Sequence, residues 1–176
     1  MKSFGFHEQF RKSREGVLLT ALYLLNRPGT KDVAVLDTEN DAQKKGYDLM
    51  VTHTGDKERQ YVEVKTDFYT TGNVFLETVS SSDAGKPGCF LSSLADVWAY
   101  YLTALDKMLM FTLARVREEI MERHEEEAYR EARPLVWGRD GGYVAEGLVV
   151  PIRDVAASDF CTEISNFRSQ CQAQAA

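Results

Sequence analysis

The sequence predicts an α/β domain (α+β) in which helices flank a mixed central sheet. Three observations predict this class: a helix-like leucine spacing near the N-terminus, three strand-like segments joined by short turns, and a later alternation of helical and extended segments. Segments in this order pack most simply as helices against a sheet. The chain of 176 residues can bury one core, and we expect a single domain over residues 1–168.

The first segment, residues 6–26, is expected to be a helix. Its leucines recur at the three- and four-residue spacing of one helix face, and Pro28-Gly29 provides a stop. Residues 33–36 form a short apolar run that is expected to be extended. The polar residues 37–46 are expected to form a loop.

Three strand-like segments follow, at residues 47–51, 61–65 and 73–79. The first two are separated by a turn around Gly55, and all three are rich in residues that favour strands. Connections this short favour an antiparallel meander of the three segments.

The remaining segments alternate between helical and extended character. Ser92 or Ser93 is expected to cap a short helix whose Trp98 packs into the core. The expected elements are a helix over 94–102, a strand over 107–113, a charged helix over 114–131, a strand over 143–152 and a loose tail over 169–176.

The composition is that of an ordinary soluble protein. Hydrophobic residues make up 44% and charged residues 27% of the chain, and no apolar run approaches the length of roughly 20 residues needed to cross a membrane. The N-terminus lacks the order of a signal peptide, so we expect a cytoplasmic protein with no membrane partner. The three cysteines are widely spaced, as expected for reduced thiols.

Two neighbouring segments place charged groups on otherwise apolar strands. The two-residue period of a strand puts Glu63 and Lys65 on one face, and Asp48 is a lone acid in an apolar run. If the two segments form a hairpin, both carboxylates lie on one face, where a divalent metal ion would relieve their repulsion. The alternative is a salt-bridging surface pair on an unrelated α+β domain.

Gly46-Tyr47-Asp48-Leu49, followed by Glu63-Val64-Lys65, resembles the PD-(D/E)XK nuclease superfamily. The resemblance extends over residues 6–113 and is strongest to small phage-type and Holliday-junction-resolvase-like members. It implies a restriction-endonuclease-like αβββαβ core with a helix and a strand appended. Tyr47 stands where the motif often has proline.

The resemblance implies a metal centre. Asp48, Glu63 and the backbone carbonyl of Val64 would bind Mg²⁺, with Mn²⁺ as a substitute. Lys65 would orient or help deprotonate the attacking water and stabilise charge on the phosphate. Many members add an acid from the first helix, for which Glu15 is preferred to Glu8. Glu77, an acid in the third strand, is a candidate to support the metal ligands.

The expected activity is that of a magnesium-dependent phosphodiesterase acting on DNA, with endonuclease or junction-resolving cleavage favoured. The net charge of −6 leaves a second hypothesis, a nuclease-fold protein that no longer cuts and serves as a binding or assembly factor, for example a phage protein acting on a host system. Enzymes that cut both strands often pair across a two-fold axis, which leaves a homodimer open. The candidate nucleic-acid contacts are Arg11, Lys12, Lys44, Lys45 and Lys86.

Overall fold

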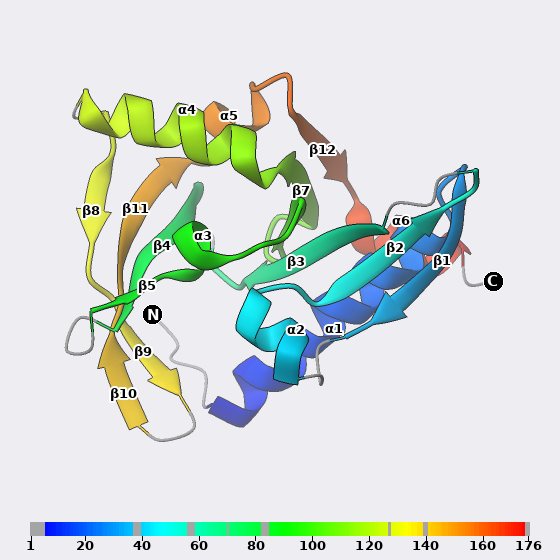
Figure 1. Cartoon of the computed structure of the whole chain (residues 1–176), viewed down its shortest axis with the longest axis horizontal. Coiled ribbons are helices and arrows are strands. Elements are labelled where there is room, and N and C mark those ends of the chain that lie inside the picture. Colours follow the sequence, from blue (N-terminus) through cyan, green and yellow to red (C-terminus); the bar gives the residue numbers. More distant parts are fainter. Residues whose placement is uncertain are drawn as a thin grey trace.

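Six strands form the main sheet, in the order β1-β2-β3-β6-β7-β12 (Figure 1). The computed structural model describes residues 6–36, 40–55, 59–69, 71–81, 85–126, 128–138 and 141–174. The strands of this sheet are β1 (Thr30–Val35), β2 (Leu49–His53), β3 (Arg59–Asp67), β6 (Val97–Leu102), β7 (Lys107–Thr112) and β12 (Cys161–Ser165).

The main sheet is mixed. Its first three strands form an antiparallel meander, β6 runs parallel to β3, and β7 and β12 then pair antiparallel. Helices pack against it, which confirms the predicted α/β class with a mixed, helix-flanked sheet.

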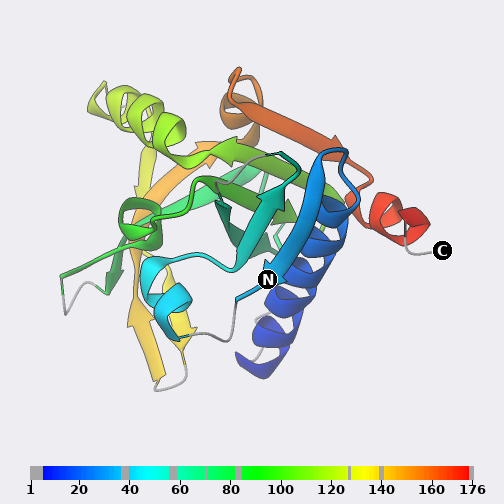
Figure 2. The ribbon, with the colours of Figure 1, turned by 45° about the vertical axis from the view of Figure 1, so that its right-hand side comes forward.

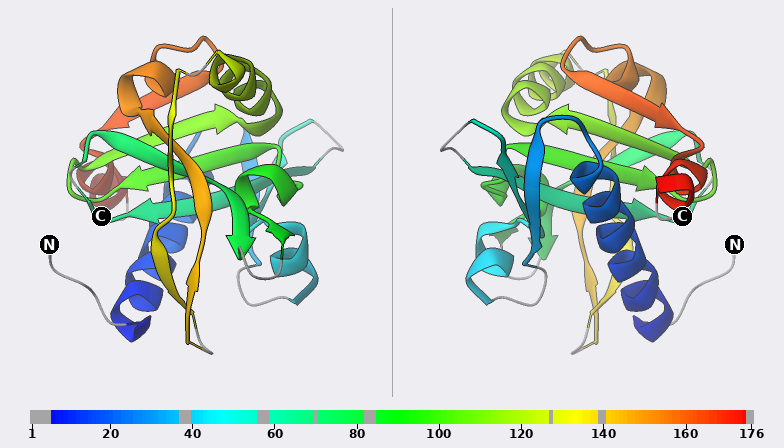
Figure 3. Two further views of the ribbon diagram at one scale, coloured as in Figure 1. Left: turned by 90° about the vertical axis from the view of Figure 1, so that its left-hand side faces the viewer. Right: turned by 90° about the vertical axis from the view of Figure 1, so that its right-hand side faces the viewer.

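A second sheet of four strands has the order β5-β4-β11-β8. Its members are β5 (Lys86–Pro87), β4 (Asn73–Ser81), β11 (Glu146–Pro151) and β8 (Arg130–Ala132), and a separate hairpin joins β9 (Leu135–Gly138) to β10 (Gly141–Val144). The long strands of the second sheet cross those of the main sheet in Figure 3. The segment predicted to complete the meander, residues 73–79, lies here instead. Both edges of β3 are already occupied, by β2 and β6, so β4 pairs with β11.

The helix α1 (Phe6–Leu25) covers one face of the main sheet, and the second sheet lies on the other side (Figure 2). On the α1 face, Val17 and Leu24 pack with Leu49, Val62 and other apolar side chains of the sheet. A larger cluster fills the space between the two sheets, and its members include Tyr47, Leu76, Trp98 and Leu148. Within the described ranges, no helix has the length and apolarity required to cross a bilayer.

The helix predicted over residues 94–102 is wrong: Val97–Leu102 is the strand β6. β6 lies in the middle of the main sheet, and all of its residues after Val97 are buried. A strand covered on both faces shows no polar–apolar alternation, so its continuous apolar run cannot be distinguished from a helix by its pattern. Trp98 is buried in the core as predicted. Ser92 and Ser93 cap no helix at residue 94.

Other elements differ in extent from the predictions. The predicted loop over 37–46 contains α2 (Asn40–Lys45), and the charged helix is shorter than expected, as α4 (Leu113–Glu125). A loose tail was predicted from residue 169, but α6 (Phe167–Gln174) packs there against α1. The remaining helices are α3 (Cys89–Ser92) and α5 (Ile152–Ala156).

Candidate functional site

Asp48 directly precedes β2. The antiparallel ladder of β2 and β3 begins one residue later, with the pair of Leu49 and Val62. The N–H of Asp48 donates to the carbonyl of Val62 at 2.8 Å, so the backbone is still hydrogen-bonded at that point. Val62 and Val64 face α1, so Glu63 and Lys65 lie on the opposite face of the sheet, and Asp48 is close enough to Lys65 to raise its pKa.

Glu63 is buried, with 7% of its surface exposed, and forms an ion pair with Lys65. Its Oε1 lies 2.5 Å from the Nζ of Lys65. Burial alone lowers the pKa of Lys65, but the Glu63 carboxylate, with smaller contributions from Cys89 and Asp48, outweighs burial and raises this pKa well above its ordinary value. Lys65 is therefore a fixed ammonium group at neutral pH.

The carboxylate of Asp48 accepts a backbone hydrogen bond from β3. β2 begins at Leu49, and Oδ2 of Asp48 accepts the N–H of Val64 at 2.8 Å. This bond orients the carboxylate toward β3, on which Glu63 and Lys65 lie. The sequence therefore brings Asp48, Glu63 and Lys65 together, and the backbone of Val64 lies between the last two.

A turn at Gly46 positions Asp48 beside β3. Gly46 has φ of +69°, and a Cβ at this residue would lie 3.0 Å from the Cα of Ser93. The hydroxyl of Ser93 donates to the carbonyl of Gly46, and the N–H of Leu94 donates to the carbonyl of Lys45 at 2.7 Å. The loop before Asp48 is thus fixed against the segment after α3.

We expect Gly46→Ala to destabilise the protein by about 2 to 3 kcal/mol, because a left-handed conformation and a backbone contact are both made unfavourable. Gly55→Ala is the matched control, since Gly55 also has a positive φ, of +87°, but its added Cβ would meet no described residue within 4 Å apart from its chain neighbours. Chemical denaturation of both variants gives the measurement. Equal losses would show that the contact with Ser93 does not hold the loop.

Lys65 has two further neighbours that sequence reasoning did not assign to the site. Its Nζ lies 5.5 Å from the centre of the Trp98 ring, and Trp98 pairs with Glu63 in the parallel ladder. Cys89 of α3 is close enough for the ammonium to act on its thiol, although burial raises the pKa of Cys89 overall. Glu77 of β4 accepts the N–H of Cys89 at 3.4 Å, so this predicted acid lies at the edge of the same cluster. No spacing in the sequence signals Cys89.

All three cysteines are free, and their thiols are expected to react slowly with iodoacetamide at pH 8. Burial raises the pKa of Cys161 and of Cys171 to about 11, and raises that of Cys89. A thiol with a pKa of about 11 is ionised to about one part in a thousand at pH 8. Peptide-level mass spectrometry should show rates that rise about tenfold per pH unit up to pH 10. Labelling at pH 8 as fast as that of free cysteine would contradict these pKa values.

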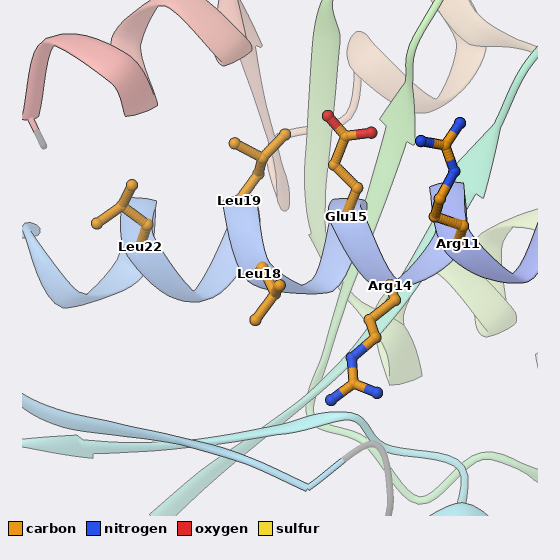
Figure 4. A pocket seen from close by; sticks show the side chains of 6 residues that line it. All are labelled: Arg11, Arg14, Glu15, Leu18, Leu19 and Leu22. Atoms are coloured by element: carbon orange, nitrogen blue, oxygen red, sulfur yellow. The ribbon is translucent and has the colours of Figure 1, made fainter.

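The first-helix acid is not brought to the pair. Glu15 forms an ion pair of 2.9 Å with Arg168 of α6, and the neighbouring Gly16 packs against Thr66, on the α1 face of β3. Glu15 and Arg11 point to one side of α1, along a groove lined by its leucines (Figure 4). The structure therefore does not bring Glu15 to Glu63, which faces the other side of the sheet. The side chain of Glu8 lies outside the described residues.

The candidate nucleic-acid contacts separate into two groups. Arg11 and Lys12 belong to α1, and the Nζ of Lys12 lies 5.4 Å from the ring centre of Phe68. Lys44 and Lys45 are exposed in the last turn of α2, which packs on the acid-bearing face of the sheet through Ala42. The exposed Lys86 lies on β5, three residues before Cys89. In this second group, Lys45 lies three residues before Asp48.

The two carboxylates of Asp48 and Glu63 are ligands of the kind that a hard divalent cation such as Mg²⁺ prefers. Mg²⁺ is commonly bound through one or two carboxylates, with water and substrate phosphate completing its shell, and Asp48 and Glu63 supply two carboxylates that both act on Lys65. Among the described residues, no third His, Cys, Asp or Glu joins them in a metal-binding group. The carbonyl of Val64, water and substrate oxygens would have to provide the other ligands.

Comparison of the chain with models of known protein families, with curated proteins and with solved structures found no match.

Proposed function

We propose that the protein is a metal-dependent nuclease of the PD-(D/E)XK type that hydrolyses DNA phosphodiester bonds as an endonuclease or junction-resolving enzyme. One observation carries the proposal: Lys65 is paired to Glu63, and the carboxylate of Asp48 accepts the N–H of Val64 between them and acts on Lys65. A buried carboxylate, with a second, partly buried one near the same fixed ammonium group, suits a site where a cation and a phosphate meet.

The strand order supports a restriction-endonuclease-like core. α1 is followed by the antiparallel strands β1, β2 and β3, and β6 then lies parallel to β3. The αβββαβ order has a helix in the connection between its third and fourth strands. Here the described part of that connection holds β4, β5 and the four-residue α3. Asp48 directly precedes the second strand and Glu63 lies within the third, which supports the proposal.

Lys65 acts in this proposal as a charge, not as a base. Its raised pKa keeps the ammonium protonated at neutral pH, so it would orient the attacking water and neutralise charge that develops on the phosphate. Mg²⁺, when bound, would polarise the phosphoryl oxygen and lower the pKa of a bound water. Asp48 and Glu63 would hold the cation, and the N–H of Val64 would keep Asp48 oriented.

The test is a cleavage assay on supercoiled, linear, single-stranded and branched DNA with Mg²⁺, with Mn²⁺ and with chelator. We expect metal-dependent products that are lost in Lys65→Ala. Lys107→Ala is the matched control, because Lys107 forms a similar 2.6 Å pair with Glu163, elsewhere in the same sheet. Cleavage that survives Lys65→Ala, or that needs no metal, would contradict the proposal.

A binding protein without nuclease activity is the second candidate. The net charge of −6, and a Glu63 already paired with Lys65, favour it. Tight DNA binding without cleavage, unchanged by Asp48→Asn and Lys65→Ala, would support this candidate over the nuclease.

A further inference from the structure

We propose that Leu94, with Leu91 beside it, inserts between bases of a DNA substrate next to the acid pair, so that the protein selects DNA that unstacks easily, such as a branched junction. This inference rests on the proposed nuclease function and deepens it. Leu94 is 66% exposed, the highest value among the large hydrophobic side chains of the described residues, and Leu91 is 42% exposed. A single exposed leucine is ordinary on a protein surface, but Leu94 is held by its backbone and lies beside exposed lysines.

The backbone around Leu94 is fixed on several sides. Its N–H donates to the carbonyl of Lys45 at 2.7 Å, and the preceding Ser93 donates through its hydroxyl to Gly46. Arg117 of α4 reaches the carbonyl of Ser93 at 2.6 Å. The exposed side chain of Leu94 therefore projects from a fixed backbone. A side chain that acts as a wedge, by inserting between stacked bases, requires such a backbone.

The segment that carries the leucines borders the acid pair. It begins at Cys89, next to Lys65, and ends at Asp96, whose carboxylate accepts the N–H of Tyr61 on β3 at 2.7 Å. Leu94 is bonded to Lys45, three residues before Asp48. Figures 1 and 3 show α2 and α3 beside each other on this side of the main sheet.

The charges around the leucines favour nucleic acid as the occupant. Lys44 and Lys45 are exposed beside Leu94, and Lys86 is exposed on the strand that precedes α3. Lys45 lies three residues before Asp48 and Lys86 three residues before Cys89, in a chain whose net charge is −6. Lysines position a phosphate backbone, and apolar side chains that enter a base step unstack and kink it. The exposed leucines on α1 lie on the other face of the sheet, where no acid pair accompanies them.

A wedge makes substrate choice depend on the cost of unstacking. That cost is lowest where base stacking is already interrupted, as at a branch point, and highest in a continuous duplex. We therefore expect a preference for branched DNA that depends on Leu94. Phosphate contacts made by Lys44 and Lys45 should instead contribute about equally to both kinds of DNA.

The experiment uses the full-length Asp48→Asn protein with Mg²⁺, so that DNA stays intact, and a four-way junction with 2-aminopurine at the branch. A continuous duplex of the same labelled sequence is the comparison. Binding should raise 2-aminopurine fluorescence, and adding Leu94→Ser should remove at least about half of that rise and reduce the preference for the junction about tenfold. Leu105→Ser is the matched control, because Leu105 is 42% exposed at the opposite end of β6.

An unchanged fluorescence rise and an unchanged preference in Leu94→Ser would overturn the wedge. So would binding to neither DNA, or a loss of self-association in Leu94→Ser without any effect on DNA, which would assign the leucines to a protein interface. The same experiments test the nuclease proposal independently of the wedge. Leu94-dependent unstacking by a wild-type protein that never cuts would support the wedge alone, whereas Asp48-dependent cutting that ignores Leu94→Ser would support the nuclease alone.

Discussion

Asp48→Asn is expected to reduce metal-dependent cleavage by about a hundredfold or more, because replacing even an outer partner of a metal ligand costs 10- to 100-fold and Asp48 is proposed as a direct ligand. The substitution is conservative for the fold. An asparagine oxygen at this position can still accept the N–H of Val64, as Oδ2 of Asp48 does at 2.8 Å. Initial rates over a series of Mg²⁺ concentrations, with thermal unfolding of the same samples, give the measurement.

The control for this prediction is Asp96→Asn, which alters a carboxylate that also accepts a backbone N–H, that of Tyr61 at 2.7 Å. It should leave cleavage within a few-fold of wild type, since Asp96 is not proposed to bind metal. If both substitutions reduce cleavage equally, or if Asp48→Asn unfolds the protein, the loss reflects structure and not a lost ligand.

Lys65→Met is expected to lower the free energy of unfolding by about 3 kcal/mol, because it leaves the Glu63 carboxylate buried without its partner. Adding Glu63→Gln should recover most of this loss, since it removes the uncompensated charge. The raised pKa of Lys65 means that the stabilisation is complete below the ordinary lysine value of about 10.4 and is lost as the pH rises through the folded value. Urea unfolding of the single and double variants measures the coupling.

The Lys107–Glu163 pair provides the comparison, because its side chains are more exposed, at 35% and 31%, than the 28% and 9% of Lys65 and Glu63. Lys107→Met should cost less than about 1 kcal/mol. A similar small loss for Lys65→Met would show that Glu63 is well solvated, which would contradict a site in which the Glu63–Lys65 pair is shielded from water.

The placement of Glu63 and Lys65 together could be predicted from sequence because it depends on a local rule. The two-residue period of a strand suffices to place Glu63 and Lys65 on one face, whereas Asp48 lies just before β2 and is positioned by its bond to the N–H of Val64. The same period explains why the even residues Val62 and Val64 face α1.

The elements and neighbours that the sequence does not predict depend on contacts between residues far apart in the chain. β6 reads as a continuous apolar run, and only its place between β3 and β7 makes it a strand. The sheet to which β4 belongs is decided by β11, which lies some 70 residues later in the chain. The helical spacing of Glu15 does not indicate which face of the main sheet it lies near. The contact between the neighbouring Gly16 and Thr66 places this part of α1 against the face of β3 opposite Glu63. Cys89 and Leu94 reach the site through hydrogen bonds of their loop, which no residue pattern encodes.

The most direct measurement of the central claim is a crystal structure of the protein soaked in Mn²⁺, with data collected for anomalous scattering. The account predicts an anomalous peak within ligand distance of a carboxylate oxygen of Asp48 and one of Glu63, with the Val64 carbonyl as a further ligand. A fully soaked crystal with no peak between these two carboxylates, and with Glu63 still held by Lys65, would contradict it.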